Sequence, residues 1–169
     1  MSKVAVVYWS STGNTEAMAS AVADGIREKG GEAVLHTCED FEKCARDNGV
    51  HTVLIAPPNA DEATLEEIAK HSKGYTYVLS RFGITGTENT FGKPVKVINR
   101  IKELHGATPV LGFGISTPEH VKQALEIGSK GAIAGSACVK IVEKNLNNVP
   151  KMLEELEAYV HAMKEATRA

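Results

Sequence analysis

Hydroxyl-bearing residues and a glycine stand together early in the chain, in the segment Ser10-Ser11-Thr12-Gly13-Asn14-Thr15. The segment follows a continuous apolar run and precedes an amphipathic stretch, which predicts a turn between a strand and a helix. Backbone N–H groups at a helix amino terminus, together with side-chain hydroxyls, bind anions such as phosphate. The same residue types also cap helices without binding anything, so both interpretations stay open.

A second set of glycines follows three later apolar runs. The set comprises Gly83 to Gly86, Gly112-Phe113-Gly114 and Gly135-Ser136. If these runs are parallel strands, the turns share the carboxyl edge of one sheet, where such folds bind ligands. Glycine lets a backbone approach an anion closely, and Ser136 adds a hydroxyl at the start of a helix. Glycines that only turn the chain at strand ends are the alternative interpretation.

Metal and nucleotide chemistry find little support in the sequence. The three cysteines, Cys38, Cys44 and Cys138, form no C-x-x-C pair, and the six histidines are scattered. The P-loop pattern fails because Thr87 stands where a glycine is needed, and no G-x-G-x-x-G is present. We therefore predict free thiols in a reducing compartment and no metal site.

Length and charge narrow the class of protein further. The chain has 169 residues, with 19 Lys and Arg against 21 Asp and Glu. This balance excludes an electrostatic footprint for nucleic acid or an anionic membrane, and no apolar run approaches the ~20 residues of a membrane span. A complete (β/α)8 barrel takes about 250 residues, so the length excludes one. We expect no nucleic-acid or membrane partner and a cytoplasmic location for a recombinant product.

Short apolar runs alternate with longer amphipathic ones along the whole chain, which predicts a parallel sheet with helices on its faces. The expected strands are 4–9, 32–37, 51–56, 75–80, 109–113 and 131–135. The expected helices are 14–29, 40–48, 61–71, one from Pro94, one capped by Thr117, 136–144 and 150–167. Residues 81–93 form the longest irregular stretch. Connections are usually ~2–6 residues long, so this stretch is a candidate functional loop.

The residues from Val6 to Glu16, VVYWSSTGNTE, closely resemble the opening of flavodoxins, and the likeness runs over about residues 1–37. The resemblance implies a loop for the phosphate of FMN. That loop would consist of Ser10, Ser11, Thr12, Gly13, Asn14 and Thr15. The loop after the third expected strand, 56–60, lacks the aromatic residue that stacks on the flavin in that family. We therefore expect no required cofactor and at most weak FMN binding.

Later segments resemble the carboxyl-terminal half of tryptophan synthase alpha chains, a (β/α)8-barrel family, over about residues 41–169. The segments are IAPPNAD from 55, GYTYVLSR from 74, GITG from 83, GFGIS from 112 and GAIAGS from 131. That family cleaves indole-3-glycerol phosphate to indole and glyceraldehyde 3-phosphate. The resemblance implies a phosphate site and a remnant of the substrate pocket. The site would be Gly86, Gly114, Gly135 and Ser136, and the remnant Tyr77 and Phe113. The family's two catalytic carboxylates lie in its other half and match no acid here.

The two resemblances together suggest an engineered chimera, with a flavodoxin segment, 1–37, joined to a half-barrel segment, 41–169, in a single domain over 1–169. We predict an α/β fold with a flavodoxin-like open parallel sheet of six strands in the order 2-1-3-4-5-6 and helices on both faces. The first and last helices are the candidates to cover the former barrel interior. The expected function is binding of inorganic phosphate or sulfate without native catalysis, with a monomer favoured over a dimer. An FMN-binding electron carrier and an indole-3-glycerol-phosphate lyase are the alternatives.

Overall fold

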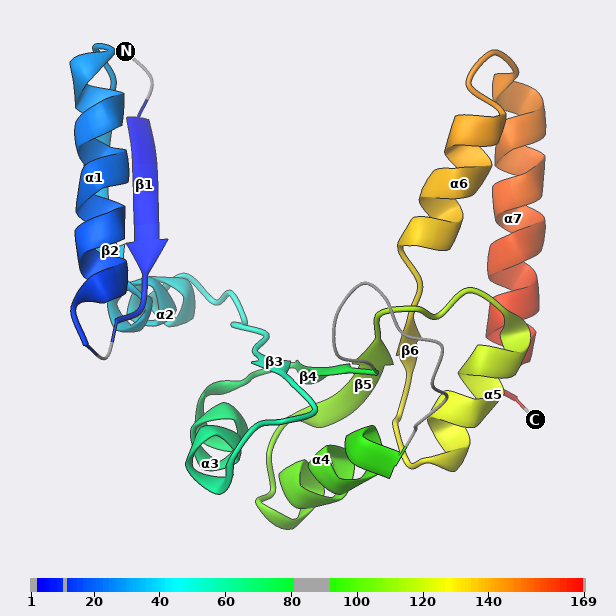
Figure 1. Cartoon of the computed structure of the whole chain (residues 1–169). Helices are drawn as coiled ribbons and strands as arrows, with labels where there is room; N and C mark the ends of the chain where they lie inside the picture. The colour runs from blue at the N-terminus through cyan, green and yellow to red at the C-terminus, as the bar shows by residue number, and fades with distance from the viewer. Residues whose placement is uncertain (1–2, 11, 81–91, 169) are drawn as a thin grey trace. The chain divides into compact units, whose positions relative to one another are not determined.

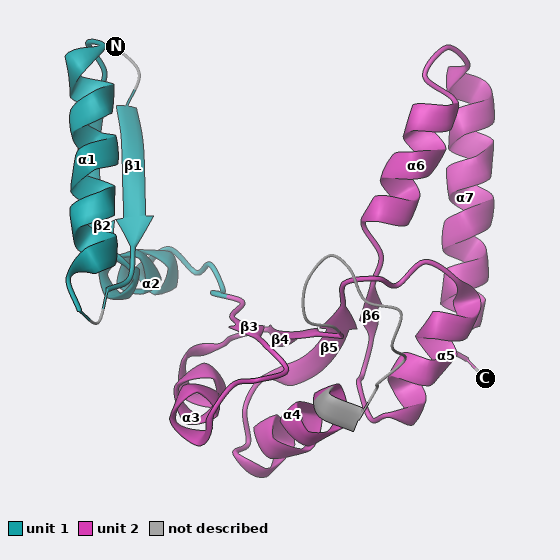
Figure 2. Cartoon of the chain, in the orientation of Figure 1, with its two compact units in different colours: residues 1–52 teal, residues 53–169 magenta. Residues whose placement is uncertain are grey.

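Parallel strands joined by helices make up the chain, and the computed structural model describes residues 3–10, 12–80 and 92–168 (Figure 1). The chain divides into two compact units, Met1–Thr52 and Val53–Ala169 (Figure 2). Each unit is described by itself below. The single domain expected over residues 1–169 stays a prediction.

Unit 1 is a pair of parallel strands with two helices. Its elements are β1 (Lys3–Tyr8), α1 (Asn14–Glu28), β2 (Glu32–Thr37) and α2 (Cys38–Asp47). The two strands pair from Lys3 opposite Glu32 to Tyr8 opposite Thr37. Helix α2 begins with a capping box, in which the Thr37 hydroxyl accepts from the Asp40 N–H at 3.2 Å. This box satisfies amide groups that the first turn of a helix leaves without a partner.

Unit 2 carries the larger sheet, a four-stranded one in the order β3-β4-β5-β6 with every pair parallel. Its elements are β3 (Ile55–Ala56), α3 (Glu62–His71), β4 (Tyr75–Leu79), α4 (Gly92–Glu103), β5 (Thr108–Gly112), α5 (Pro118–Glu126), β6 (Ala132–Ile133), α6 (Ser136–Lys144) and α7 (Val149–Glu165). Helix α5 begins as the sequence predicts, with Thr117 as its cap and Pro118 in the first turn. The predicted span of α6 is also confirmed.

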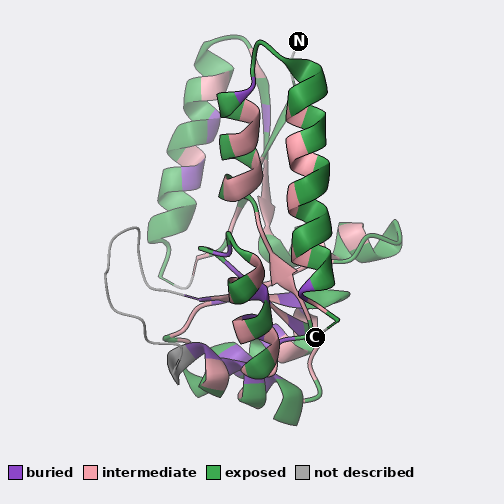
Figure 3. Ribbon diagram, turned by 90° about the vertical axis from the view of Figure 1, so that its right-hand side faces the viewer, coloured by how far each residue is buried: buried purple, intermediate pink, exposed green. Residues whose placement is uncertain are grey.

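The hydrophobic core of unit 2 lies on one face of this sheet. Alternation along β4 places Thr76 and Val78 on that face and the tyrosine side chains on the other. Helices α3, α4 and α5 cover the core face, and buried positions gather on α4 and the central strands in Figure 3. The buried apolar residues are Ala56, Leu65, Ile68, Val78, Val97, Ile98, Ile101, Leu111, Ile115, Val121, Ala124 and Ala166.

Two buried serines, each standing three residues before a strand, tie neighbouring strands together in the same way. The Ser72 hydroxyl accepts from the Leu54 N–H, 18 residues earlier, at 3.1 Å and donates to the Tyr75 carbonyl. The Ser129 hydroxyl accepts from the Leu111 N–H, also 18 residues earlier, at 2.9 Å and donates to the Gly131 carbonyl. The β3–α3–β4 and β5–α5–β6 segments therefore share one internal pattern that length and composition did not indicate.

The predicted six-stranded sheet in the order 2-1-3-4-5-6 is wrong, because the sheets have two and four strands. Among the described residues, β1 pairs with β2 alone and β3 with β4 alone. The strand expected over 51–56 is reduced to Ile55–Ala56. Just before it, the Leu54 carbonyl still accepts from the Tyr77 N–H of β4, but the Leu54 N–H donates to the Ser72 hydroxyl instead of to a strand.

The last helix was a candidate to cover the face of the sheet opposite the core, and it does not cover that face. Helix α7 contacts α5 and α6, and Ala166, just beyond its end, joins the core beside Val121 and Ala124 of α5. Helix α7 therefore packs on the side of the sheet that already carries α3 to α5. No helix in the described part of the chain is long and apolar enough to cross a membrane.

Candidate anion-binding site

The register of the sheet brings two of the predicted anion-binding turns together. Gly112, the last residue of β5, pairs with Ile133, the last residue of β6. Gly114 and Gly135 each stand two residues beyond this pair, at the carboxyl edge of neighbouring strands. The edge therefore presents both turns side by side, as sequence reasoning predicted.

The turn after β5 has an unusual backbone. Phe113 has φ 71° and Gly114 has φ 84°, so two successive residues adopt the left-handed region. Glycine does so at little cost, whereas a bulky L-residue such as phenylalanine rarely does. A non-glycine residue held in this region marks a place where the surrounding structure imposes the conformation, and such places cluster at ligand sites.

Ser80 holds this turn from the end of β4. Its N–H donates to the Gly112 carbonyl at 3.0 Å, and its hydroxyl donates to the Phe113 carbonyl. The residue is 8% exposed. Sequence reasoning assigned Ser80 no role, although a polar residue at the carboxyl end of an expected buried strand was a signal that could have found it.

Tyr77 lies over the end of β5, on the face of β4 away from the core. A Cβ atom added to Gly112 would stand 2.2 Å from both Cζ and Oη of Tyr77. The ring therefore occupies the space that any side chain at position 112 would need. Tyr77 is half-buried, whereas Phe113 is exposed, so the expected pocket remnant consists of one packed and one open aromatic residue.

The third turn leads directly into α6. Gly135 is the cap residue of this helix, and no side chain makes a capping hydrogen bond there. The first amide groups of a helix need partners from outside the helix, and an anion is a suitable one. Gly135 and Ser136 are exposed, which leaves this terminus accessible. Gly86, the fourth predicted phosphate residue, lies outside the described residues.

The loop of unit 1 is less favourable for an anion. The Ser10 hydroxyl accepts from the Gly13 N–H at 2.9 Å, and this bond occupies one of the expected groups with the turn itself. Burial, and then the Glu16 carboxylate beside it, raises the pKa of Tyr8. Glu16 stands in the first turn of α1, where its negative charge opposes a bound anion. Thr12, Asn14 and Thr15 are exposed, and Ser11 lies outside the described residues.

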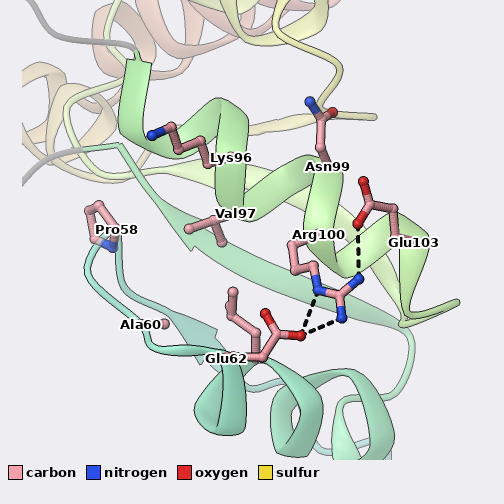
Figure 4. A pocket seen from close by; sticks show the side chains of 9 residues that line it. Pro58, Ala60, Glu62, Lys96, Val97, Asn99, Arg100 and Glu103 are labelled. Atoms are coloured by element: carbon pink, nitrogen blue, oxygen red, sulfur yellow. Dashed lines mark hydrogen bonds and ion pairs between the residues drawn. The ribbon is translucent and has the colours of Figure 1, made fainter.

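A groove of 460 Å³ lies elsewhere in unit 2, between α3 and α4, and contains none of the predicted site residues (Figure 4). Arg100 crosses it and donates from Nε to Glu62 at 2.7 Å and from Nη1 to Glu103 at 2.9 Å. These hydrogen bonds raise the pKa of Arg100 above its usual range. Two carboxylates therefore occupy the guanidinium, and the bond between Arg100 and Glu62 links α4 to α3. No cluster of His, Cys, Asp and Glu within the described ranges could hold a metal ion.

Sequential parallel strands with helices on one face and glycine-containing turns at the carboxyl edge are the arrangement of a (β/α)8-barrel segment. The family model for the tryptophan synthase alpha chain matches residues 35–168. The chain belongs to the tryptophan synthase alpha chain family.

Relatives and solved structures agree with this assignment. The tryptophan synthase alpha chain of Francisella tularensis subsp. holarctica is 49% identical over 133 residues, which cover 78% of this chain and 49% of the relative. The Actinobacillus succinogenes chain is 48% identical over 136 residues, covering 79% and 50%. A chain from a structure of the tryptophan synthase α2β2 complex of Pyrococcus furiosus matches with a TM-score of 0.62 and 31% identity, covering 74% and 50%. The chain therefore spans about half the length of the curated relatives it matches.

These findings correct two of the expectations. The hypothesis of an engineered chimera is wrong, because the family model over residues 35–168 and relatives at 49% and 48% identity make the chain a tryptophan synthase alpha-type chain, and the findings above show no flavodoxin fusion. The FMN-binding carrier loses its support for the same reason. The prediction that the chain is not an enzyme is contradicted, because the relatives carry the name of an enzyme. It had rested on the unmatched catalytic acids alone, which say nothing of what the matched half does.

Proposed function

We propose that this chain supplies the phosphate-binding half of the indole-3-glycerol phosphate site in a tryptophan synthase alpha chain. The observation that carries the proposal is the pairing of Gly112 with Ile133, which sets the Gly114 and Gly135 turns side by side at the carboxyl edge. The uncapped amino terminus of α6 adds backbone donors, and Ser136 adds a hydroxyl. These groups suit a phosphate ester.

The remainder of such a substrate would lie against Tyr77 and Phe113. Tyr77 lies in the middle of β4 with its ring over Gly112, and Phe113 directly follows β5. Aromatic side chains present flat apolar faces to a ring such as indole. The site therefore combines phosphate donors with an aromatic surface, as a substrate with an indole end and a phosphate end requires.

Titration with inorganic phosphate, followed by ¹⁵N chemical shifts, tests the site directly. Wild-type protein should show shifts at Gly114, Gly135 and Ser136. Ser136→Asp should weaken phosphate binding by at least about tenfold, because it places a like charge beside the anion. Ser10→Asp is the matched control, since it puts the same charge in the loop of unit 1 and should leave the affinity unchanged. Equal affinities in wild type and Ser136→Asp would refute the assignment.

The activity that this site serves is the cleavage of indole-3-glycerol phosphate, and indole release is the measurement. The Pyrococcus furiosus relative is described as part of an α2β2 complex. The assay therefore uses the full chain, alone and with a tryptophan synthase beta chain. We expect indole release above background, reduced in Ser136→Asp and retained in Ser10→Asp. Release that is unaffected by Ser136→Asp would separate the activity from this site.

A further inference from the structure

We infer that Ser80 is a positioning residue that holds the turn after β5 in its anion-binding conformation. The inference rests on the phosphate site proposed above and adds a residue outside that site to it. It concerns the hydroxyl of Ser80 and the carbonyl of Phe113, two groups from neighbouring strand ends.

Ser80 contacts the last residue of β5 and the first residue of the turn that follows it. Its backbone N–H donates to the Gly112 carbonyl at 3.0 Å, which extends the pairing of β4 and β5 by one residue. Its hydroxyl donates to the next carbonyl along, that of Phe113. One residue thus binds two successive carbonyls, and the second bond is made where the backbone turns left-handed.

The turn needs such a partner because packing does not hold it. The Phe113 side chain is 44% exposed, so the ring contributes little to fixing φ at 71°. Gly114 tolerates its own φ of 84°, but a glycine does not restrict the conformation of its neighbour Phe113. Among the described residues, the partly buried hydrogen bond from Ser80 is therefore the contact that keeps the Phe113 peptide in place. Without it, Phe113 is expected to return to the right-handed or extended region that L-residues prefer.

Unit 2 provides a matched control for the loss of a buried serine hydroxyl. Ser129 is 2% exposed, and its hydroxyl accepts from the Leu111 N–H at 2.9 Å and donates to the Gly131 carbonyl at 2.7 Å. These bonds do not involve the Phe113 peptide, and the Leu111 N–H also donates to the Gly131 carbonyl at 3.0 Å, so the pairing of β5 with β6 does not depend on the hydroxyl. Ser129→Ala should thus lower the stability of the same sheet without changing the anion-binding edge.

The experiment compares wild type, Ser80→Ala and Ser129→Ala in the full chain. Two quantities are measured: the affinity for inorganic phosphate, and the backbone ¹³C shifts of Phe113, which report its φ and ψ without any ligand. Ser80→Ala should move the Phe113 shifts out of the left-handed range and weaken phosphate binding about fivefold, the value of one hydrogen bond. Ser129→Ala should leave both quantities at the wild-type value. Should Ser80→Ala fail to fold, Ser80→Cys keeps the size and weakens the donor, with the same directions expected.

The outcomes separate the two proposals. If wild type binds no phosphate while Ser80→Ala still changes the Phe113 shifts, the proposed function fails and the role of Ser80 in the turn stands. If wild type binds phosphate and Ser80→Ala binds it equally with unchanged Phe113 shifts, the role of Ser80 is overturned. A loss of affinity that Ser129→Ala reproduces would also overturn it, because the effect would then be one of general stability.

Discussion

The close approach of Tyr77 to Gly112 predicts that one methyl group at position 112 displaces the tyrosine ring. A Cβ atom there would lie 2.2 Å from Cζ and Oη of Tyr77 and 2.7 Å from Cε1. Real Cβ atoms show no such contacts, so the ring must move when Gly112 becomes alanine. The backbone needs no change, because Gly112 is outside the left-handed region.

The size of the effect follows from how the ring can respond. Inserting a methyl group into a packed site costs about 1–3 kcal/mol. Tyr77 is half-buried, so it can turn partly toward solvent instead of compressing the core. We therefore expect Gly112→Ala to lower the free energy of unfolding by about 1–2 kcal/mol, in the lower part of that range.

A double-mutant cycle measured by urea unfolding tests this reasoning. In a Tyr77→Ala background the clash is gone, and Gly112→Ala should cost close to nothing or stabilise slightly by restricting the unfolded chain. Gly131→Ala is the control, because a Cβ there would lie at an ordinary 3.5 Å from Val110 Cγ1. An equal cost of Gly112→Ala with and without the Tyr77 ring would show that the ring is not the obstacle.

Two other predictions concern stability. Ile98→Ala should lower the free energy of unfolding by about 2–5 kcal/mol, because Ile98 is fully buried in the unit 2 core, and urea unfolding measures the loss. The hydrogen bond from the Asn145 amide, at 2.9 Å, and then the Lys144 ammonium lower the pKa of Glu155. Its contribution to stability is therefore present above the unfolded pKa of about 4.3 and is lost as the pH falls through the folded value. Glu155→Gln should flatten the acid side of the stability profile, and an unchanged acid slope would contradict this.

Local patterns in the sequence predicted the elements of unit 2 well. The cap at Thr117 and the span 136–144 depend on residues close together in the chain, so the sequence contains their signals. The strand expected over 51–56 was too long, and just before the observed strand the partner of the Leu54 N–H is a side chain instead of a strand. That partner, Ser72, stands 18 residues away, and no local pattern in the sequence predicts the hydrogen bond between them.

Strand order and family membership both show that one local pattern is not enough to predict the fold or the family. A six-stranded sheet requires a pairing between β1 and β3, and hydrophobic runs alone do not say which strands pair. The likeness of Val6–Glu16 to a flavodoxin was misleading because hydroxyls and a glycine at a strand-to-helix turn suit a cap as well as a phosphate loop. In the structure the Ser10 hydroxyl accepts from the Gly13 N–H within the turn, and no side chain caps α1. The likeness to tryptophan synthase alpha chains was spread over several strand ends, and it is confirmed.

The candidate site is a property of the sheet edge more than of any single loop. The Gly114 and Gly135 turns meet because β5 and β6 end on the same pair of residues, and the first of them is held by Ser80 from a third strand. Moving the end of β5 by one residue would break its alignment with β6 and place Phe113 beyond the reach of Ser80. The pairing of β5 with β4, from Tyr75 opposite Thr108 to Leu79 opposite Gly112, prevents such a shift. The phosphate-binding half therefore depends on the register of β5 against β4 and β6, and on the hydroxyl of Ser80 at the end of β5.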